Sequence, residues 1–362
     1  MTPRRVLVTG GCGFIGSELV QQLLDAGARV TVVDICTYAV SERTVAQIES
    51  HPSARVERVD LREIDALRDV LEEVRPERVF HLAAESHVDQ SITRPAAFVE
   101  TNLLGTANLL IVLSELWRGG RLAADFRMVH VSTDEVFGSL ALESTDRFTE
   151  TTPYDPRSPY SASKAGSDHL VRAWYHTWGF PAIVTHSSNN YGPRQYPEKL
   201  IPVIVRALAA GDPLPIYGDG RNVRDWIHVS DHARALRLVA EGGEAGGRWC
   251  VGAGHELSNL DLVTAICRIF DQREGVAPGT HEARITFVPD RPGHDRRYGI
   301  DARALRSLGW RPEVRFEEGL ARTVEWYLDH PDYWSVTAAG AREGGSDADD
   351  RADDDAGGND DA

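Results

Sequence analysis

Runs of apolar residues alternate with segments of helical periodicity through the first half of the chain. The continuous apolar runs are typical of strands that are buried on both faces of a sheet. The expected strands are Arg5–Thr9, Arg29–Asp34, Arg55–Val59, Arg78–Ala83, Arg127–Ser132 and Ala182–His186. The expected helices between them are Ile15–Ala26, Glu63–Val74, Pro95–Trp117 and Ser158–Trp178. This alternation predicts an α/β fold with a doubly wound parallel sheet.

The pattern changes from about Tyr191, where Pro and Gly cluster and the apolar runs become shorter. The strand–helix pair Asp225–Val229 and Asp231–Glu241 predicts a return to the first domain. Leu257–Phe270 and Arg315–His330 predict helices of a smaller second domain. The predicted boundaries are 1–190 with 224–250 for the first domain, 191–223 with 251–335 for the second, and 339–362 for a disordered acidic tail.

Composition and charge narrow the class of protein. Of the 362 residues, 42% are hydrophobic and 26% are charged, which is enough apolar material for a sizeable core. The formal net charge is −16, and the segment from Ala341 onward holds nine of the 55 acidic residues and two of the 39 basic ones. Because an acidic surface repels phosphodiester backbones, we expect small-molecule ligands and no nucleic-acid partner.

The sequence also bears on location and metal binding. We see no stretch that approaches the roughly 20 apolar residues of a membrane span, and the N-terminal residues lack the apolar region of a signal peptide. Four cysteines without CxxC spacing favour neither a disulfide framework nor a zinc site. These features predict a cytoplasmic protein with no membrane partner and no metal.

A glycine-rich loop, Thr9–Gly16, follows the first expected strand and opens the first expected helix. Glycines at Gly10, Gly13 and Gly16 let the backbone approach a pyrophosphate, and the helix N-terminus supplies N–H groups and positive potential. Asp34 ends the next strand, at the interval expected of a carboxylate that binds ribose hydroxyls. This acid disfavours a 2′-phosphate, so the pattern predicts NAD rather than NADP in a Rossmann-type domain. The alternative is a structural turn beside an unrelated acidic residue.

Tyr160 and Lys164 lie four positions apart in an expected helix that starts after Pro159, which places both on one helical face. A nearby ammonium favours the tyrosinate and so prepares the phenol to act as a base. The chain has only one other lysine, Lys199, so neither lysine is typical of its surface. The alternative is a polar pair on an ordinary exposed helix.

Thr133, Asp134 and Glu135 stand at the carboxyl end of an expected strand, where parallel sheets bind ligands. The threonine hydroxyl suits a hydrogen bond to a substrate hydroxyl. Adjacent carboxyls in unlike environments permit one protonated and one ionised group. The alternative is an N-cap cluster for the turn that follows.

Together, the glycine loop, Thr133–Glu135 and Tyr160–Lys164 resemble the extended short-chain dehydrogenase/reductase family, and more narrowly its dTDP-glucose 4,6-dehydratases. Supporting segments, within a resemblance that runs from about Arg4 to Leu328, are His81–Asp89, Thr101–Thr106, Asn189–Pro193, Pro197–Pro202, Tyr217–Gly220, Val223–Trp226 and Arg291–Tyr298. Asp134 is the discriminating residue, because related epimerases and decarboxylases carry other residues there. Phe137 and Arg194 depart from the family pattern, in which a Tyr and an aromatic residue are common.

The resemblance implies conversion of dTDP-glucose to dTDP-4-keto-6-deoxyglucose and water, with NAD regenerated in each turnover. Tyr160 would accept the proton of the C4 hydroxyl, with Thr133 and Lys164 assisting. Glu135 would remove the C5 proton while Asp134 protonates the departing C6 hydroxyl. Oxidation needs one base and elimination needs a separate acid and base, which accounts for these residue types.

The resemblance also implies binding residues and a homodimer. For the cofactor they are Gly10, Gly13, Phe14, Ile15, Gly16, Asp34, Asp60, Leu61, Leu82, Ala84, Thr101, Tyr160, Lys164 and Asn190. For the nucleotide sugar they are Ser86, Thr133, Asn189, Lys199, Leu200, Pro215, Tyr217, Arg224, Asn259, Arg291 and His294. Two alternatives stay open: a related enzyme that acts on a UDP-linked sugar, and a catalytically silent NAD-binding protein of the same fold. The pathway that the product enters also stays open.

Overall fold

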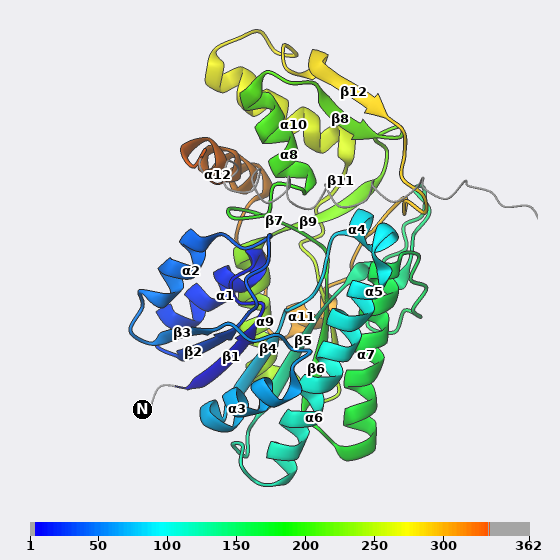
Figure 1. Ribbon diagram of the computed structural model, residues 1–362. Coiled ribbons are helices and arrows are strands. Elements are labelled where there is room, and N and C mark those ends of the chain that lie inside the picture. The colour runs from blue at the N-terminus through cyan, green and yellow to red at the C-terminus, as the bar shows by residue number, and fades with distance from the viewer. Residues whose placement is uncertain (1–3, 332, 334–362) are drawn as a thin grey trace, which may run out of the picture.

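The computed structural model of the protein describes residues 4–331 and 333, and the predicted acidic tail over 339–362 lies outside these residues. Figure 1 shows a large twisted sheet between two layers of helices, with a smaller group of helices and short strands above its upper edge. The upper group is built from the second half of the chain, as the change of pattern after Tyr191 predicts.

The large sheet has seven strands in the order β10-β6-β5-β4-β1-β2-β3, and every neighbouring pair is parallel. This confirms the predicted doubly wound parallel sheet. The strands are β1 (Arg5–Thr9), β2 (Arg29–Val33), β3 (Ala54–Glu57), β4 (Arg78–His81), β5 (Arg127–Thr133), β6 (Ala182–Ser187) and β10 (Arg248–Val251). Six of them correspond to predicted strands, and β10 adds an edge strand that the sequence pattern did not indicate.

Alternate residues of each strand enter two separate cores, as the twofold period of a strand requires. Val6 and Val8 of β1 pack under α1 (Phe14–Asp25), α2 (Glu42–Glu49) and α9 (Val229–Gly242). Leu7 packs on the opposite face with α3 (Ile64–Val74), α6 (Gly105–Arg118) and α7 (Pro159–Trp178). Both faces of the sheet are therefore covered, which explains why its strands are apolar throughout.

The helix expected over Pro95–Trp117 is not one regular helix. It begins as α5 (Pro95–Phe98), passes through a π-helical segment (Val99–Leu104) and continues as α6. By length and composition alone, the stretch Pro95–Arg118 is apolar enough to cross a membrane, which corrects the expectation that no segment comes close. Half of its most apolar window is buried, as in a core helix of a folded domain.

The remaining strands form two small sheets. One is β11-β9-β7, made of β7 (Asn189–Tyr191), β9 (Val223–His228) and β11 (Glu256–Ser258), and the other pairs β8 (Leu214–Tyr217) with β12 (Ile285–Val288). The strand near Asp225–Val229 is β9, and it pairs with β7 and β11 and does not join the large sheet. The return is made by α9, which packs on α1 and β5, and by β10.

The upper group has its own apolar core. It lies among α8 (Leu200–Ala210), α10 (Asn259–Glu274) and α12 (Phe316–Asp329), with Leu214 and Ile216 of β8. The predicted helices Leu257–Phe270 and Arg315–His330 correspond to α10 and α12. Short helices complete the described chain: α4 (Val88–Thr93), α11 (Arg303–Ser307) and two 3-10 turns, η2 (Asp134–Phe137) and η3 (Glu282–Arg284).

Candidate active site

The predicted catalytic and cofactor-binding residues cluster at the carboxyl edge of the large sheet. Thr9 ends β1, Thr133 ends β5, and Asp34 directly follows β2. Because all seven strands are parallel, these ends meet on one edge, which is where sheets of this type bind ligands.

The loop after β1 has the shape that the glycine spacing predicts. A Cβ at Gly16 would lie 2.1 Å from the carbonyl oxygen of Gly10, and one at Gly10, where φ is +68°, would lie 2.6 Å from the backbone nitrogen of Ala83. Gly13 differs, because it caps α1 and its nearest neighbour to a Cβ is 3.4 Å away. Gly10 and Gly16 therefore permit close packing of the loop, while Gly13 leaves room in front of the helix N-terminus.

Asp34 connects this loop to the loop after β2. Its Oδ2 accepts a hydrogen bond from the backbone N–H of Cys12 at 3.0 Å, and its Oδ1 accepts one from Cys36 at 2.9 Å. Burial raises the pKa of Asp34, while these two N–H donors act to lower it. The carboxylate is thus fixed beside the helix N-terminus, in the place expected of a ribose ligand.

Other predicted cofactor residues lie along the same edge, but some make contacts within the protein. Arg62 donates to both carboxylate oxygens of Asp60, at 3.1 and 2.9 Å, and lowers the pKa of that residue. Asn190 is 2.9 Å from the His232 ring through its Oδ1 and donates to the Ser188 carbonyl. The remaining members are Phe14 and Ile15 in the first turn of α1, Leu61 in the core, Leu82 and Ala84 after β4, and Thr101 in the π-helical segment. Their contacts with a cofactor stay predictions.

Tyr160 and Lys164 lie in the first turns of α7, which starts with a capping box formed by Ser158 and Ser161. Lys164 is 4% exposed, and its Nζ donates to the Val131 carbonyl of β5 at 2.9 Å. Burial and the charge of Glu135 raise the pKa of Tyr160, and a hydrogen bond with the Thr133 hydroxyl lowers it. The alternative of an exposed polar pair is therefore wrong.

The two adjacent carboxyls have different surroundings. Asp134 is 2% exposed, and its Oδ2 makes no hydrogen bond within the described residues. Burial raises its pKa well above the ordinary value, and the charge of Glu135 adds to this. Burial also raises the pKa of partly buried Glu135, but three cations oppose that rise. The N-cap of η2 is Thr133, whose hydroxyl accepts a hydrogen bond from the Glu135 N–H at 3.3 Å. The carboxyls of Asp134 and Glu135 therefore do not cap this turn.

The three cations are Arg291, Arg224 and Lys199, and they come from three distant parts of the chain. Arg224 is buried, donates to the Asp295 carbonyl at 3.0 Å and lies 4.1 Å above the Tyr298 ring. Lys199 donates to the Ser86 carbonyl at 2.9 Å. This convergence supplies positive charge next to Glu135, as a diphosphate requires.

The other predicted sugar-binding residues surround this cluster. Tyr217 is 45% exposed and packs edge-on to His294 at 6.5 Å, and the His294 ring is 2.6 Å from Asp290. The Oδ1 of Asn189 is buried without a hydrogen-bond partner among the described residues. The last three members lie on three elements: Leu200 opens α8, Pro215 lies in β8 and Asn259 opens α10.

The sequence analysis missed two residues that hold Arg224, namely Asp295 and Tyr298. The Tyr298 hydroxyl donates to the Asp295 carboxylate at 2.7 Å. Both belong to the segment Arg291–Tyr298, which supported the family resemblance without being assigned a role. Only their packing against β9 shows that they orient a cation.

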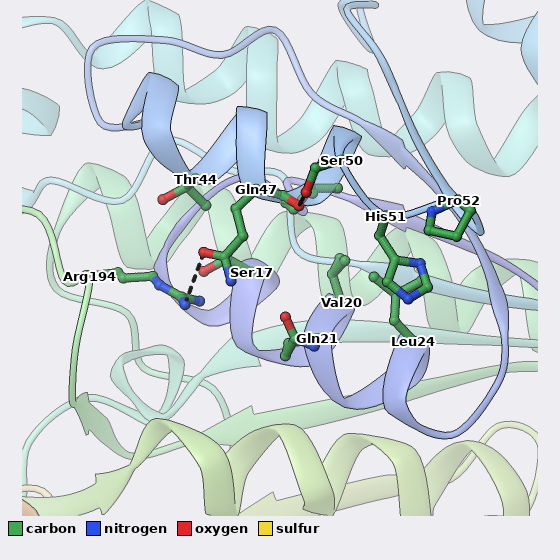
Figure 2. A pocket seen from close by; sticks show the side chains of 11 residues that line it. Ser17, Val20, Gln21, Leu24, Thr44, Gln47, Ser50, His51, Pro52 and Arg194 are labelled. Carbon is green, nitrogen blue, oxygen red and sulfur yellow. Dashed lines mark hydrogen bonds between the residues drawn. The ribbon is translucent and has the colours of Figure 1, made fainter.

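The two departures from the family pattern have separate structural consequences. Phe137 stacks on Tyr154, with 5.6 Å between ring centroids, and takes part in the core behind the site. Arg194 extends away to donate to Gln47 of α2 at 3.3 Å and lines a hollow of about 260 Å³ between α1 and α2. Figure 2 shows this hollow, and none of the residues that line it is a predicted site residue.

Comparisons with known proteins agree with this geometry. The family model described as GDP-mannose 4,6 dehydratase matches residues 7–323. A dTDP-glucose 4,6-dehydratase of Xanthomonas campestris pv. campestris (strain B100) is 48% identical, over 89% of this chain and 92% of that protein. The dTDP-glucose 4,6-dehydratase 1 of Escherichia coli (strain K12) is 46% identical, over 93% and 96%. The crystal structure of DesIV, a dTDP-glucose 4,6-dehydratase from Streptomyces venezuelae solved with NAD bound, has a TM-score of 0.83 and 43% identity, over 92% of this chain and 99% of that one.

The parallel sheet, the glycine loop and the Tyr160–Lys164 pair define a short-chain dehydrogenase/reductase of the extended type. With matches of this identity over nearly the full length of the relatives, the chain belongs to the dTDP-glucose 4,6-dehydratase family.

Proposed function

We propose that this protein dehydrates dTDP-glucose to dTDP-4-keto-6-deoxyglucose, with NAD as a cofactor that is regenerated in each turnover. The observation that carries the proposal is the unequal pair Asp134 and Glu135. Asp134 is buried with a strongly raised pKa, so it holds a proton to donate, while three cations favour the ionised form of Glu135. An epimerase has no use for such a pair, since it eliminates no water.

The first step is removal of the C4 hydroxyl proton by Tyr160. Burial and Glu135 disfavour the tyrosinate, so the hydrogen bond from Thr133 and the ammonium of Lys164 must stabilise it. NAD, when bound, would accept the hydride from C4 and return it to C6, and C5 is then reprotonated. The resulting 4-ketone makes the proton at C5 acidic.

The second step is elimination across C5 and C6. Glu135 removes the C5 proton, and Asp134 donates its proton to the departing C6 hydroxyl. Arg224, Arg291 and Lys199 bind the diphosphate, and their charges oppose the rise that burial causes in the pKa of Glu135. A separate acid and base are required because one proton leaves C5 while another must reach the departing oxygen on C6.

The residues present fit a dinucleotide. Gly13 leaves space at the N-terminus of α1, where a pyrophosphate is stabilised by free N–H groups, and Asp34 lies beside it to bind ribose hydroxyls. Gly10, Gly13, Gly16 and Asp34 would hold the cofactor so that Tyr160 and Lys164 face its reactive end.

We further propose a cytoplasmic homodimer. Ile92, Val99 and Leu104 are exposed apolar residues on α4 and the π-helical segment, next to α7, and a two-helix contact between copies would cover them. We also propose that residues 1–190 with 224–250 bind the dinucleotide, while 191–223 with 251–335 bind the nucleotide sugar. The separate core of the upper group supports this division.

The test of the function is incubation of the purified protein with dTDP-glucose and no added NAD, followed by mass spectrometry. Loss of one water from the sugar nucleotide is the expected result, because the cofactor is retained. The assay is repeated with added NAD and then with UDP-glucose. Turnover of UDP-glucose alone would change the assigned substrate, and bound NAD without any turnover would support the catalytically silent alternative.

A further inference from the structure

A buried network of polar side chains lies behind the catalytic helix, and the mechanism above does not use it. Its centre is Asp168 of α7, which is 0% exposed. The carboxylate accepts a hydrogen bond from the Ser132 hydroxyl at 2.8 Å and from His186 Nε2 at 3.1 Å, and His130 Nε2 lies 3.1 Å from its other oxygen. Ser132 of β5 and His186 of β6 thus hold one oxygen of the carboxylate, and His130 of β5 lies beside the other.

The network is adjacent to the catalytic lysine. Asp168 follows Lys164 by one helical turn, so the two side chains share a face of α7. Lys164 donates to the carbonyl of Val131, and the next residue, Ser132, donates to Asp168. Neighbouring positions of β5 therefore hold a buried ammonium and a buried carboxylate that lie one helical turn apart on α7.

The other titratable groups that face Lys164 do not carry a negative charge. They are Tyr160 on its own helix, His130 on β5 and His81 on β4. Burial lowers the pKa of His130 to about 4 and that of His81 well below its ordinary value, so both rings are neutral near pH 7. Among the described residues, Asp168 is the one carboxylate whose charge raises the pKa of Lys164.

Asp168 also remains ionised in this position. Burial acts to raise its pKa, but the hydrogen bonds from His130 and His186 bring it below the ordinary value. The Tyr154 side chain also interacts with the Asp168 carboxylate, and its hydroxyl lies 3.2 Å from His186 Nε2. A buried carboxylate with this many donors is costly to neutralise.

We propose that Asp168 is a positioning residue that keeps Lys164 protonated on the face of α7 that it shares with Tyr160. Without a counter-charge, a fully buried ammonium loses its proton, because desolvation disfavours the charged form. Burial already lowers the pKa of Lys164 to about 8, and the charge of Asp168 opposes that fall. The catalytic meaning of this pair rests on the proposed function, but its electrostatic effect is measurable without substrate.

The chain offers a direct probe, because Lys164 and Lys199 are its only lysines. Protein labelled with carbon-13 at the lysine Cε gives two NMR signals, and a Lys199→Arg sample assigns them. The signal of Lys164 is followed against pH in the wild type and in Asp168→Asn, both with their retained cofactor. We expect the Lys164 midpoint to fall by about 1–3 pH units in Asp168→Asn, while the Lys199 signal in the same tube titrates as before.

The control variant is Ser132→Ala, which removes one hydrogen bond to Asp168 but keeps its charge. Its Lys164 midpoint should stay at the wild-type value. The Nδ1 atoms of His130 and His186 make no hydrogen bond within the described residues, so either ring can change tautomer to accept from an asparagine amide. If Asp168→Asn does not fold, Asp168→Ser removes the same charge in a smaller side chain.

An unchanged Lys164 midpoint in a folded, charge-neutral Asp168 variant would overturn the proposal. The activity assay adds a second readout, in which the alkaline limb of the pH–rate profile moves to lower pH in Asp168→Asn and not in Ser132→Ala. If the wild type does not dehydrate dTDP-glucose, the proposed function fails, but the NMR titration still decides the role of Asp168.

Discussion

On one side of the site, the dinucleotide side, Gly10, Gly16 and Asp34 shape the backbone within one loop and the end of the adjacent strand. On the other, the sugar side, Lys199, Arg224 and Arg291 reach Glu135 from three distant segments. The first side depends on close backbone packing, with a Cβ at Gly16 only 2.1 Å from its neighbour. The second depends on charges held by side-chain contacts. The difference shows that a binding loop is encoded locally, whereas a charge cluster exists only after the whole chain has folded.

The largest expected effect is at Tyr160, where the two sides meet. Tyr160→Phe removes the base for C4 oxidation, so we expect the rate to fall by about 10²–10⁴, with neither product nor NADH formed in a single turnover. NADH absorbance and product mass measure the two events. Melting temperature and NAD content should match the wild type, and an undiminished rate would remove Tyr160 from this role.

The next largest expected effect is on water elimination, when Asp134 or Glu135 is changed. In Asp134→Asn the C4 oxidation continues, but the C6 hydroxyl leaves about 10²-fold more slowly, so NADH accumulates. Since Glu135 still removes the C5 proton, this variant should exchange that hydrogen with deuterium oxide. Glu135→Gln is the matched variant, in which NADH accumulates without exchange. Exchange in both variants, or in neither, would contradict the assignment of acid and base.

On the dinucleotide side, substitutions of Gly16 and Gly13 distinguish a residue needed for close packing from one needed for cofactor binding. Gly16→Ala forces a Cβ against the Gly10 carbonyl, and we expect it to lower the free energy of unfolding by roughly 1–3 kcal/mol. Gly13→Ala meets nothing closer than 3.4 Å, so it should fold normally but lose bound NAD. Urea denaturation and the NAD content of purified protein distinguish the two. Normal NAD content in Gly13→Ala would show that the cofactor does not approach this residue.

The same difference explains what the sequence could predict. Strands β1 to β6, the glycine loop, Thr133–Glu135 and Tyr160–Lys164 are short contiguous patterns, and their local geometry follows from period, capping and backbone freedom. The strand β9 was recognisable near Asp225, but which sheet it joins is decided by its partners β7 and β11. The long helix was expected to be regular because its composition does not indicate the π-helical segment at Val99–Leu104.

Buried polar residues were the hardest to predict. Asp168 occupies a helix and is indistinguishable in sequence from an acid on a solvated face. Only the packing of α7 on β5 shows that it lies against Ser132 and His130. Asp295 and Tyr298 likewise lie in the segment Arg291–Tyr298, which supported the family resemblance. Only their contacts with Arg224 show that they hold this cation. Such partners come from distant segments, and a single sequence does not pair them.

On the sugar side, Arg291 should contribute less than the catalytic residues. Arg291→Ala is expected to raise the KM for dTDP-glucose roughly tenfold. Because Arg291 lowers the pKa of Glu135, its loss should also move the acid limb of the pH–rate profile to higher pH. Arg296→Ala is the control, since Arg296 is bound to Asp219 instead. An unchanged acid limb would mean that Arg291 does not act on Glu135.

The last effect concerns His232 and develops only as the pH falls. Its Nδ1 lies 2.9 Å from the Asn190 amide oxygen on the dinucleotide side, and burial lowers its pKa to about 3. Between that value and the ordinary 6.5, the unfolded chain binds a proton that the folded chain does not. Stability from this group is therefore complete above pH 6.5 and falls by about 1.4 kcal/mol for each pH unit below it.

His232→Gln cannot take up this proton, so its stability should fall less steeply with acid than that of the wild type. Urea midpoints at several pH values between 4 and 7 measure the slope. At neutral pH we expect His232→Gln to be less stable than the wild type, because its amide does not reproduce the contact of the ring with Asn190. Parallel slopes in the two proteins would show that His232 is not the group that titrates, and that acid destabilises the dinucleotide side through other residues.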